Sequence, residues 1–186
     1  MTFSLCEWKN YTNNGASFAP PPPYTTYPVS SEHAIYLHDT SGSAHCNAGP
    51  SGADLPGGFG FLAVGGGCSA QVDDQSWVND SPGNSIPNSC KTLLPSLQGT
   101  TIFLPVYDNA NGLNGSNGRY HISGFAAFFL TGWNFSGDRV ASIATGNKIC
   151  TPSQTCLYGW FTQALVPAAG GGGGTPRGTT SVRLIG

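Results

Sequence analysis

Charged side chains are scarce in this chain of 186 residues. They make up 9% of the sequence, whereas about 25% is usual for soluble proteins. Only seven residues are Lys or Arg and the net charge is −2, so no basic patch is available to bind a phosphate backbone. The composition therefore argues against a nucleic-acid partner.

A long apolar run is also missing from the first 30 residues, which show neither a signal peptide nor a membrane span. The opening MTFSLCEWKN instead indicates a strand that begins in mid-domain. We interpret residues 1–186 as a single exported domain, with a Gly-rich loop at 168–174, whose N-terminal targeting or anchoring segment has been removed. Contact with a membrane is expected only through that segment.

None of the six cysteines lies in a C-x-x-C pair, which disfavours zinc ribbons and thioredoxin-like motifs. An even number of cysteines in a chain with few charges and many turns favours disulfides made in an oxidising compartment. The sequence permits several pairings, of which we expect the nearest-neighbour set. These pairs are Cys6–Cys46, Cys68–Cys90 and Cys150–Cys156.

What the chain has in abundance is turn residues, 27 Gly and 14 Pro, and apolar segments between them. The segments typical of strands are 31–39, 100–108, 118–133, 156–166 and 179–186. We expect a mainly β fold: a single disulfide-bonded β-sandwich or barrel-like domain with long Gly/Pro/Asn-rich loops and one short helix.

Single residues refine this expectation. Pro105 predicts a sheet edge or a bulge, because proline cannot donate to a β-ladder, and Gly124 is a second candidate bulge. The one expected helix lies within 84–100 and is interrupted by Pro95. The proline-rich segment 18–28 is either a ligand for a proline-binding domain or an extended connector, and the connector is favoured.

The segment DNANGLNGSNG (108–118) raises the question of a calcium loop. Asp108 is its one acid and no Glu follows, whereas calcium loops carry several acidic oxygens and end in Glu, so calcium is a weak alternative. Asn-Gly pairs tolerate positive φ, so the segment favours a hairpin turn. Its side chains also form a candidate contact loop, made by Asp108, Asn111, Asn114 and Asn117.

Acidic residues beside tryptophan raise a second question. Asp73, Asp74 and Asp80 lie around Trp77, and a carboxylate next to an indole face suits a carbohydrate. A solvated loop anchored by one Trp is the simpler interpretation. Trp77 and Trp133 are the candidate aromatic platforms. No catalytic or metal-ligating pattern rises above background, so we expect neither an enzyme nor a cofactor.

Six segments together resemble the extracytoplasmic part of TadE/TadG-like proteins of bacterial Flp (Tad) pilus assembly. They are FSLCEW (3–8), PSGADLPGGFGFL (50–62), SPGNSIPNSC (81–90), GTTIFLPVYD (99–108), GRYHISGFAAFFLTGW (118–133) and CLYGWF (156–161). The resemblance implies a domain displayed outside the cytoplasmic membrane behind a single N-terminal membrane helix. It supplies no catalytic residues.

The resemblance implies a non-enzymatic structural or interaction domain that contacts other pilus or envelope proteins at the bacterial cell surface. Self-association into a homo-oligomer is left open. Two alternatives stand beside it: a secreted carbohydrate-binding or adhesin module, and a secreted hydrolase. The adhesin alternative requires an exposed aromatic platform, and the hydrolase requires a nucleophile with a histidine in hydrogen-bond reach.

Overall fold

The structure is a computed structural model that describes residues 1–37, 58–63, 68, 72–73, 75–81, 86, 88–112, 118–167, 176–177 and 179–182. In these residues it is mainly β with few helices, as the turn-rich sequence predicts. The strands are β1 (Thr2–Ser4), β2 (His33–Tyr36), β3 (Phe59–Gly60), β4 (Trp77–Asn79), β5 (Thr101–Asn111), β6 (Arg119–Phe135), β7 (Asp138–Val140), β8 (Cys156–Thr162), β9 (Ala164–Pro167), β10 (Pro176–Arg177) and β11 (Thr179–Val182).

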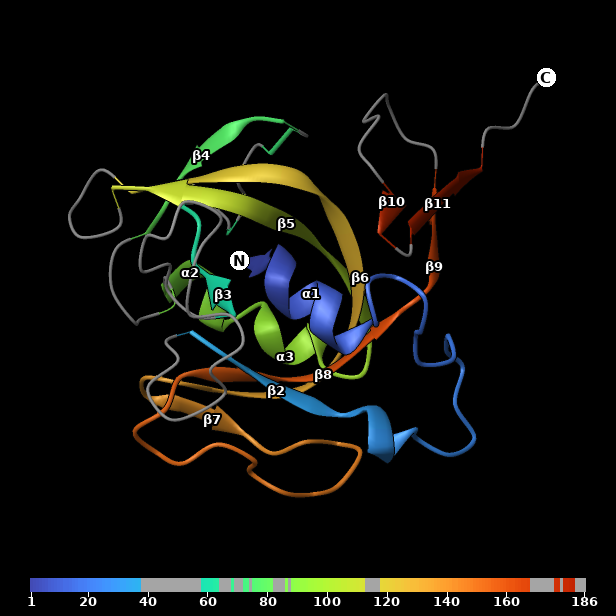
Figure 1. Ribbon diagram of the computed structural model, residues 1–186. Coiled ribbons are helices and arrows are strands. Elements are labelled where there is room, and N and C mark those ends of the chain that lie inside the picture. The colour runs from blue at the N-terminus through green and yellow to red at the C-terminus, as the bar shows by residue number, and fades with distance from the viewer. Residues whose placement is uncertain are drawn as a thin grey trace.

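Nine of these strands form one mixed sheet with the central order β2-β8-β6-β5-β1-β3. Strands β4, β7 and β10 each pair with β6 outside that path, and β9 and β11 make a separate parallel pair. Strand β6 bends strongly along its length, so the sheet curls around helix α1 (Leu5–Tyr11) (Figure 1). This curl matches the barrel-like form of the expected fold.

The predicted hairpin is confirmed as strands β5 and β6, which pair from Thr101↔Phe129 to Asn111↔Arg119. Pro105 does not lie at a sheet edge, because β5 is flanked by β6 and β1. A bulge follows it at once, between Val106 and Tyr107. Gly124 lies at the same irregularity with φ 153°, as predicted for a bulge glycine.

The inside of the curl is filled by one apolar core. Phe3, Phe59, Phe128 and Phe161 belong to it, and Trp8 of helix α1 packs there too. Alternate residues of β6 point inward, because successive side chains of a strand face opposite sides of a sheet. Strand β6 is therefore the central strand around which the core packs.

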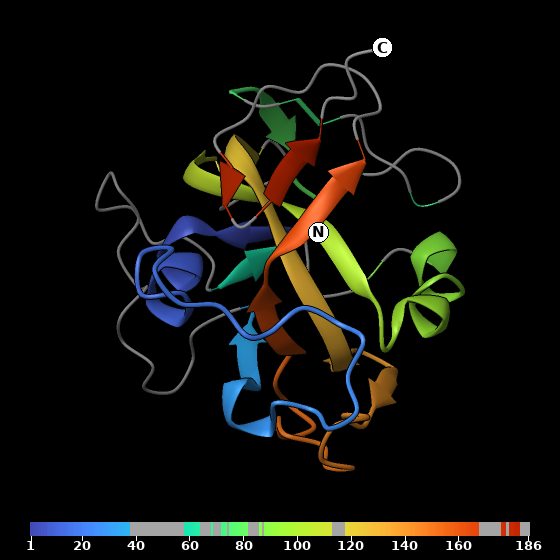
Figure 2. The same ribbon diagram turned by 90° about the vertical axis from the view of Figure 1, so that its right-hand side faces the viewer.

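The opposite face of β6 and β8 is covered by the proline-rich segment 18–28. Ala19 bridges to Thr162, and the Tyr24 and Tyr27 rings pack against stacked Phe129 and Trp160. Figure 2 shows the chain between α1 and β2 crossing in front of β8 and β6. The connector expected from the sequence is therefore a strap across the sheet.

Residues 5–11 correct the expectation of an N-terminal strand. Only Thr2–Ser4 is a strand, and helix α1 follows with Ser4 as its N-cap, whose side chain accepts a hydrogen bond from the Cys6 amide. Ser4 and Glu7 have the S-x-x-E spacing of a capping box, which promotes a helix start. Local capping therefore outweighs the apolar residues that suggested a strand.

The expected single helix within 84–100 is also corrected. Two one-turn helices stand there, α2 (Asn88–Lys91) and α3 (Leu94–Leu97), and a 3-10 turn, η1 (Val29–Ser31), precedes β2. Pro95 lies in the first turn of α3, where proline's missing amide costs no hydrogen bond. Gly99, at φ 76°, ends the segment. Within the described residues no helix has the length and apolarity needed to cross a membrane.

Two of the three expected disulfides are present in the structure, Cys68–Cys90 and Cys150–Cys156. Cys6 is disulfide-bonded as well, while Cys46 of the expected Cys6–Cys46 pair lies outside the described residues. Such cross-links indicate an oxidising, extracytoplasmic environment. The Gly-rich segment 168–174 also lies outside the described residues.

Candidate functional site

A row of three side chains crosses strands β4, β6 and β5 on one face of the sheet. Trp77 pairs directly with His121 in the β4–β6 ladder, and their ring centroids lie 5.2 Å apart. On the other side of His121, its Nδ1 lies 2.7 Å from an Asp108 carboxylate oxygen. We call Trp77, His121 and Asp108 the surface row.

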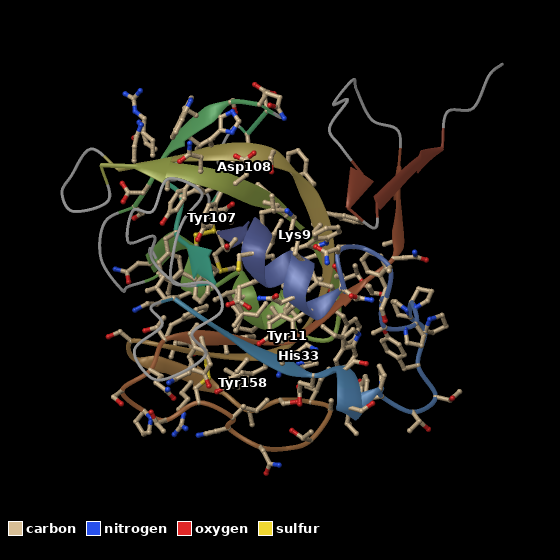
Figure 3. The ribbon with its side chains drawn as sticks, in the orientation of Figure 1. Lys9, Tyr11, His33, Tyr107, Asp108 and Tyr158 are labelled. Carbon is tan, nitrogen blue, oxygen red and sulfur yellow. A yellow bond between two sulfur atoms is a disulfide. The ribbon has the colours of Figure 1, made fainter. Side chains whose placement is uncertain are left out.

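The surface row is open to solvent. Trp77 is 43% exposed, and the side chains of His121 and Asp108 retain 22% and 34% of their surface. In Figure 3, Asp108 lies on the outer side of the curved sheet and Tyr107 on the inner side, toward α1. The row thus combines an aromatic surface, an imidazole and a carboxylate within reach of a ligand.

Two opposed β-bulges bring Asp108 to His121. On β6, Ser123 is the extra residue between the Val106↔Gly124 and Tyr107↔Ile122 pairs. On β5, Asp108 is the extra residue before the Asn109↔His121 pair. A bulge re-aims the residue that it leaves unpaired, and here it points a carboxylate at the histidine of the neighbouring strand.

The inner side of the same strands is rigid and apolar. Tyr107, Tyr120 and Ile122 are buried together, and the two tyrosine rings lie 4.7 Å apart. Burial raises the pKa of both phenols well above the usual range, so they stay protonated. The strands that carry His121 and Asp108 are therefore held in place by buried packing on their inner face.

Of the three acids expected around Trp77, Asp80 lies on the opposite face of the sheet. Asp80 follows β4 on the side of Val78, close to Tyr120, and burial raises its pKa. Asp73 is exposed, its carbonyl accepting a hydrogen bond from the Ser76 hydroxyl, and Asp74 lies outside the described residues. The carboxylate of the site comes instead from Asp108, about thirty residues further along the chain.

Trp133 is not an aromatic platform, which corrects the second candidate. It is 0% exposed, because β7 and β8 flank it and the core packs around it. Its indole Nε1 donates to Asp138 Oδ2 at 2.9 Å. In the sequence Trp77 follows a polar segment and Trp133 ends an apolar run, and the strands that flank Trp133 bury it.

The expected contact loop begins later than the sequence suggested. Asp108 lies inside β5, and Asn111 is exposed at the end of that strand, because the ladder continues to Asn111↔Arg119. Asn114 and Asn117 lie outside the described residues, as do the remaining candidate loop positions between 113 and 117. No group of three or more His, Cys, Asp or Glu that could hold a metal ion occurs in the described part of the chain.

In the His121–Asp108 pair a carboxylate orients an imidazole, as it does in catalytic triads where the imidazole is a general base. In the portion of the chain that is described, no serine hydroxyl or cysteine thiol hydrogen-bonds to His121. The pair places an imidazole and a carboxylate side by side on the partly exposed face next to Trp77.

A second feature is an open apolar pocket of about 320 Å³ between helices α2–α3 and strand β5. Leu94 is buried in its wall, while Leu93 and Phe103 are 42% and 38% exposed. The Cys68–Cys90 disulfide lines another wall. The pocket has the size and apolarity of sites that take small ligands or single anchoring side chains.

Comparison with protein-family models, with curated proteins and with solved structures finds no match for this chain.

Proposed function

We propose that this protein is an exported, non-enzymatic interaction domain of the bacterial cell envelope that works beside an Flp/Tad-type pilus. Its partners are other pilus or envelope proteins, and a second copy of the chain is an alternative partner. The resemblance to TadE/TadG-like proteins supports the pilus assignment, and the disulfides support an extracytoplasmic site of action.

The observation that carries the proposal is the apolar pocket between α2–α3 and β5. Leu93 and Phe103 are 42% and 38% exposed at the rim of this pocket, so a partner that covers them gains about 0.5–1 kcal/mol for each. Protein interfaces gain most of their affinity from a few anchors placed in such pockets. An apolar side chain of a partner protein is the occupant with this chemistry.

The placement of the resembling segments gives further support. FSLCEW, GTTIFLPVYD, GRYHISGFAAFFLTGW and CLYGWF form β1 with α1, β5, β6 and β8, which stand together at the centre of the sheet. The resembling segments thus cover the structural framework, and they also contain Phe103 of the pocket and Asp108 and His121 of the surface row.

The test is co-purification of the tagged native chain with sheared surface filaments, in cells with and without the pilus assembly ATPase. We expect retention that depends on the ATPase. Leu93→Asp should abolish retention, because a carboxylate in the pocket loses its hydration when a partner binds.

Ile149→Asp is the matched control, since Ile149 is 40% exposed and does not line the pocket. It should leave retention unchanged. Release into the medium in both strains would refute the pilus assignment. Equal loss with both variants would refute the pocket as the contact surface.

A further inference from the structure

We propose that the surface row of Trp77, His121 and Asp108 is a binding site for a neutral saccharide. This inference goes beyond the protein-interaction function and does not depend on it, because the row and the apolar pocket share no lining residue. The saccharide would bind the polar and aromatic surface that forms where the two bulges of the hairpin bring Asp108 next to His121.

The indole of Trp77 supplies the apolar part of such a site. One side of a pyranose ring presents several C–H groups and packs on a flat aromatic face, while its hydroxyls point outward. Trp77 is the exposed member of the four tryptophans, since Trp8, Trp133 and Trp160 are at most 6% exposed. An indole held at a strand position beside His121 is also fixed in direction.

The His121–Asp108 pair supplies the polar part. The 2.7 Å contact to Asp108 uses Nδ1 of His121 and fixes the orientation of the imidazole ring. Within the described residues Nε2 makes no hydrogen bond, and the Asp108 carboxylate keeps further acceptor capacity. Sugar hydroxyls both donate and accept, so one saccharide can engage both groups while it stacks on Trp77.

Other ligand classes fit this surface less well. An anionic ligand would meet the Asp108 carboxylate at close range. An apolar protein surface would strip water from that carboxylate without replacing its hydrogen bonds, which is costly. A neutral polyol replaces the lost water with hydroxyl groups and therefore matches both the indole and the carboxylate.

The test uses the full chain on an array of neutral hexose, N-acetylhexosamine and uronic acid oligosaccharides. The strongest binder is then titrated into wild type and each variant by isothermal titration calorimetry, and into wild type by fluorescence. Because the other tryptophans are buried, a change in emission on sugar addition reports on Trp77. We expect binding to a neutral oligosaccharide. Trp77→Ala should weaken it at least tenfold, and Asp108→Asn by several fold.

Trp77→Phe should restore part of the affinity, since it keeps an aromatic face, and Ile149→Ala should have no effect. Leu93→Asp should also leave sugar binding unchanged, which separates this result from failure of the pilus proposal. Failure to bind any neutral glycan would overturn the inference, as would equal binding by wild type and Trp77→Ala. Loss of filament retention in Trp77→Ala without any glycan binding would show a protein contact instead.

Discussion

The two halves of strand β6 differ in what covers them. From Ala126 to Phe135 every residue is buried, with the core on one face and the strap 18–28 or the β7–β8 region on the other. From Arg119 to Phe125 burial is incomplete, since Arg119, His121 and Phe125 keep exposed surface. We call Ala126–Phe135 the closed half and Arg119–Phe125 the open half.

Hydrogen bonds reinforce the closed half. The Glu32 carboxylate accepts bonds from the Thr131 and Ser142 hydroxyls, which ties β2 to β6 and to the chain after β7. The Gln98 amide donates to the Thr131 and Ala141 carbonyls at 2.8 and 2.9 Å. These bonds join segments far apart in sequence, so the closed half stabilises the fold.

The open half has the opposite character. Its inner face is buried through Tyr120 and Ile122, while its outer face carries His121 of the surface row. One part of β6 thus stabilises the fold, and the other part carries a residue of the proposed binding surface. Substitutions in the closed half should act on the free energy of unfolding, and those in the open half on binding.

The largest expected effect is at Gly159, which pairs with Leu130 in the closed half and has φ 154°. A Cβ there would lie 2.1 Å from the Phe129 carbonyl oxygen, a rigid backbone atom. Gly159→Ala should reduce the free energy of unfolding by at least ~3 kcal/mol, measured by urea denaturation.

Gly137→Ala is the control for backbone conformation alone. Gly137 has φ 77° and no heavy atom within 4 Å of a built Cβ, so about 1–2 kcal/mol is expected from the left-handed backbone. Equal losses at the two glycines would contradict the tight packing assigned to the closed half.

The second effect concerns the Cys68–Cys90 and Cys150–Cys156 disulfides. Cys68–Cys90 spans 22 residues beside the pocket, and Cys150–Cys156 spans 6 residues next to the closed half. Loop-closure entropy predicts a loss of about 3 kcal/mol when the first is replaced by two alanines and about 2 kcal/mol for the second.

Urea denaturation of the two double-alanine variants tests this ranking. The longer cross-link should matter more, because it closes the larger loop in the unfolded chain. A larger loss for Cys150→Ala with Cys156→Ala would show that burial of those sulfurs outweighs chain entropy, since both are at most 1% exposed.

The sequence predicted the parts of the fold that depend on local patterns. The β5–β6 hairpin follows from two long apolar runs joined by Asn-Gly pairs, and the bulge at Gly124 from a glycine inside one run. Helix α1 could also have been found, because Ser4 and Glu7 carry a capping-box spacing that outweighs a short apolar stretch.

The surface row could not be read from the sequence in the same way. The contact between Asp108 and His121 depends on two opposed bulges, and the register of a ladder is not visible in residue order. The difference between exposed Trp77 and buried Trp133 depends on which strands pair beside them. The Asp108–His121 contact and the different exposure of the two tryptophans both depend on long-range strand pairing and not on side-chain type.

The smallest expected effect is a loss of stability in acid through His33, on strand β2 beside the closed half. Its ring stacks on Tyr11 at 3.9 Å, and burial lowers the pKa of His33 from 6.5, partly opposed by the charge of Glu32. Since the folded-state pKa is the lower one, the unfolded chain takes up the proton first as the pH falls. Stability is therefore complete above about pH 6.5 and decreases below it, until the folded pKa is reached.

Urea denaturation at pH 7.5 and pH 5.0 should show a lower free energy of unfolding for the native chain at pH 5.0. His33→Gln should reduce that decrease, because the titrating group is gone while the carboxylates remain. Amide exchange should locate the change: Ile35 on β2 should exchange faster at pH 5.0 relative to its own intrinsic rate, and Val78 on β4 should not. If Val78 loses protection and Ile35 does not, the acid-sensitive contact lies in the open half. The open half would then also stabilise the fold, which would contradict the division of β6 into a stabilising half and a binding half.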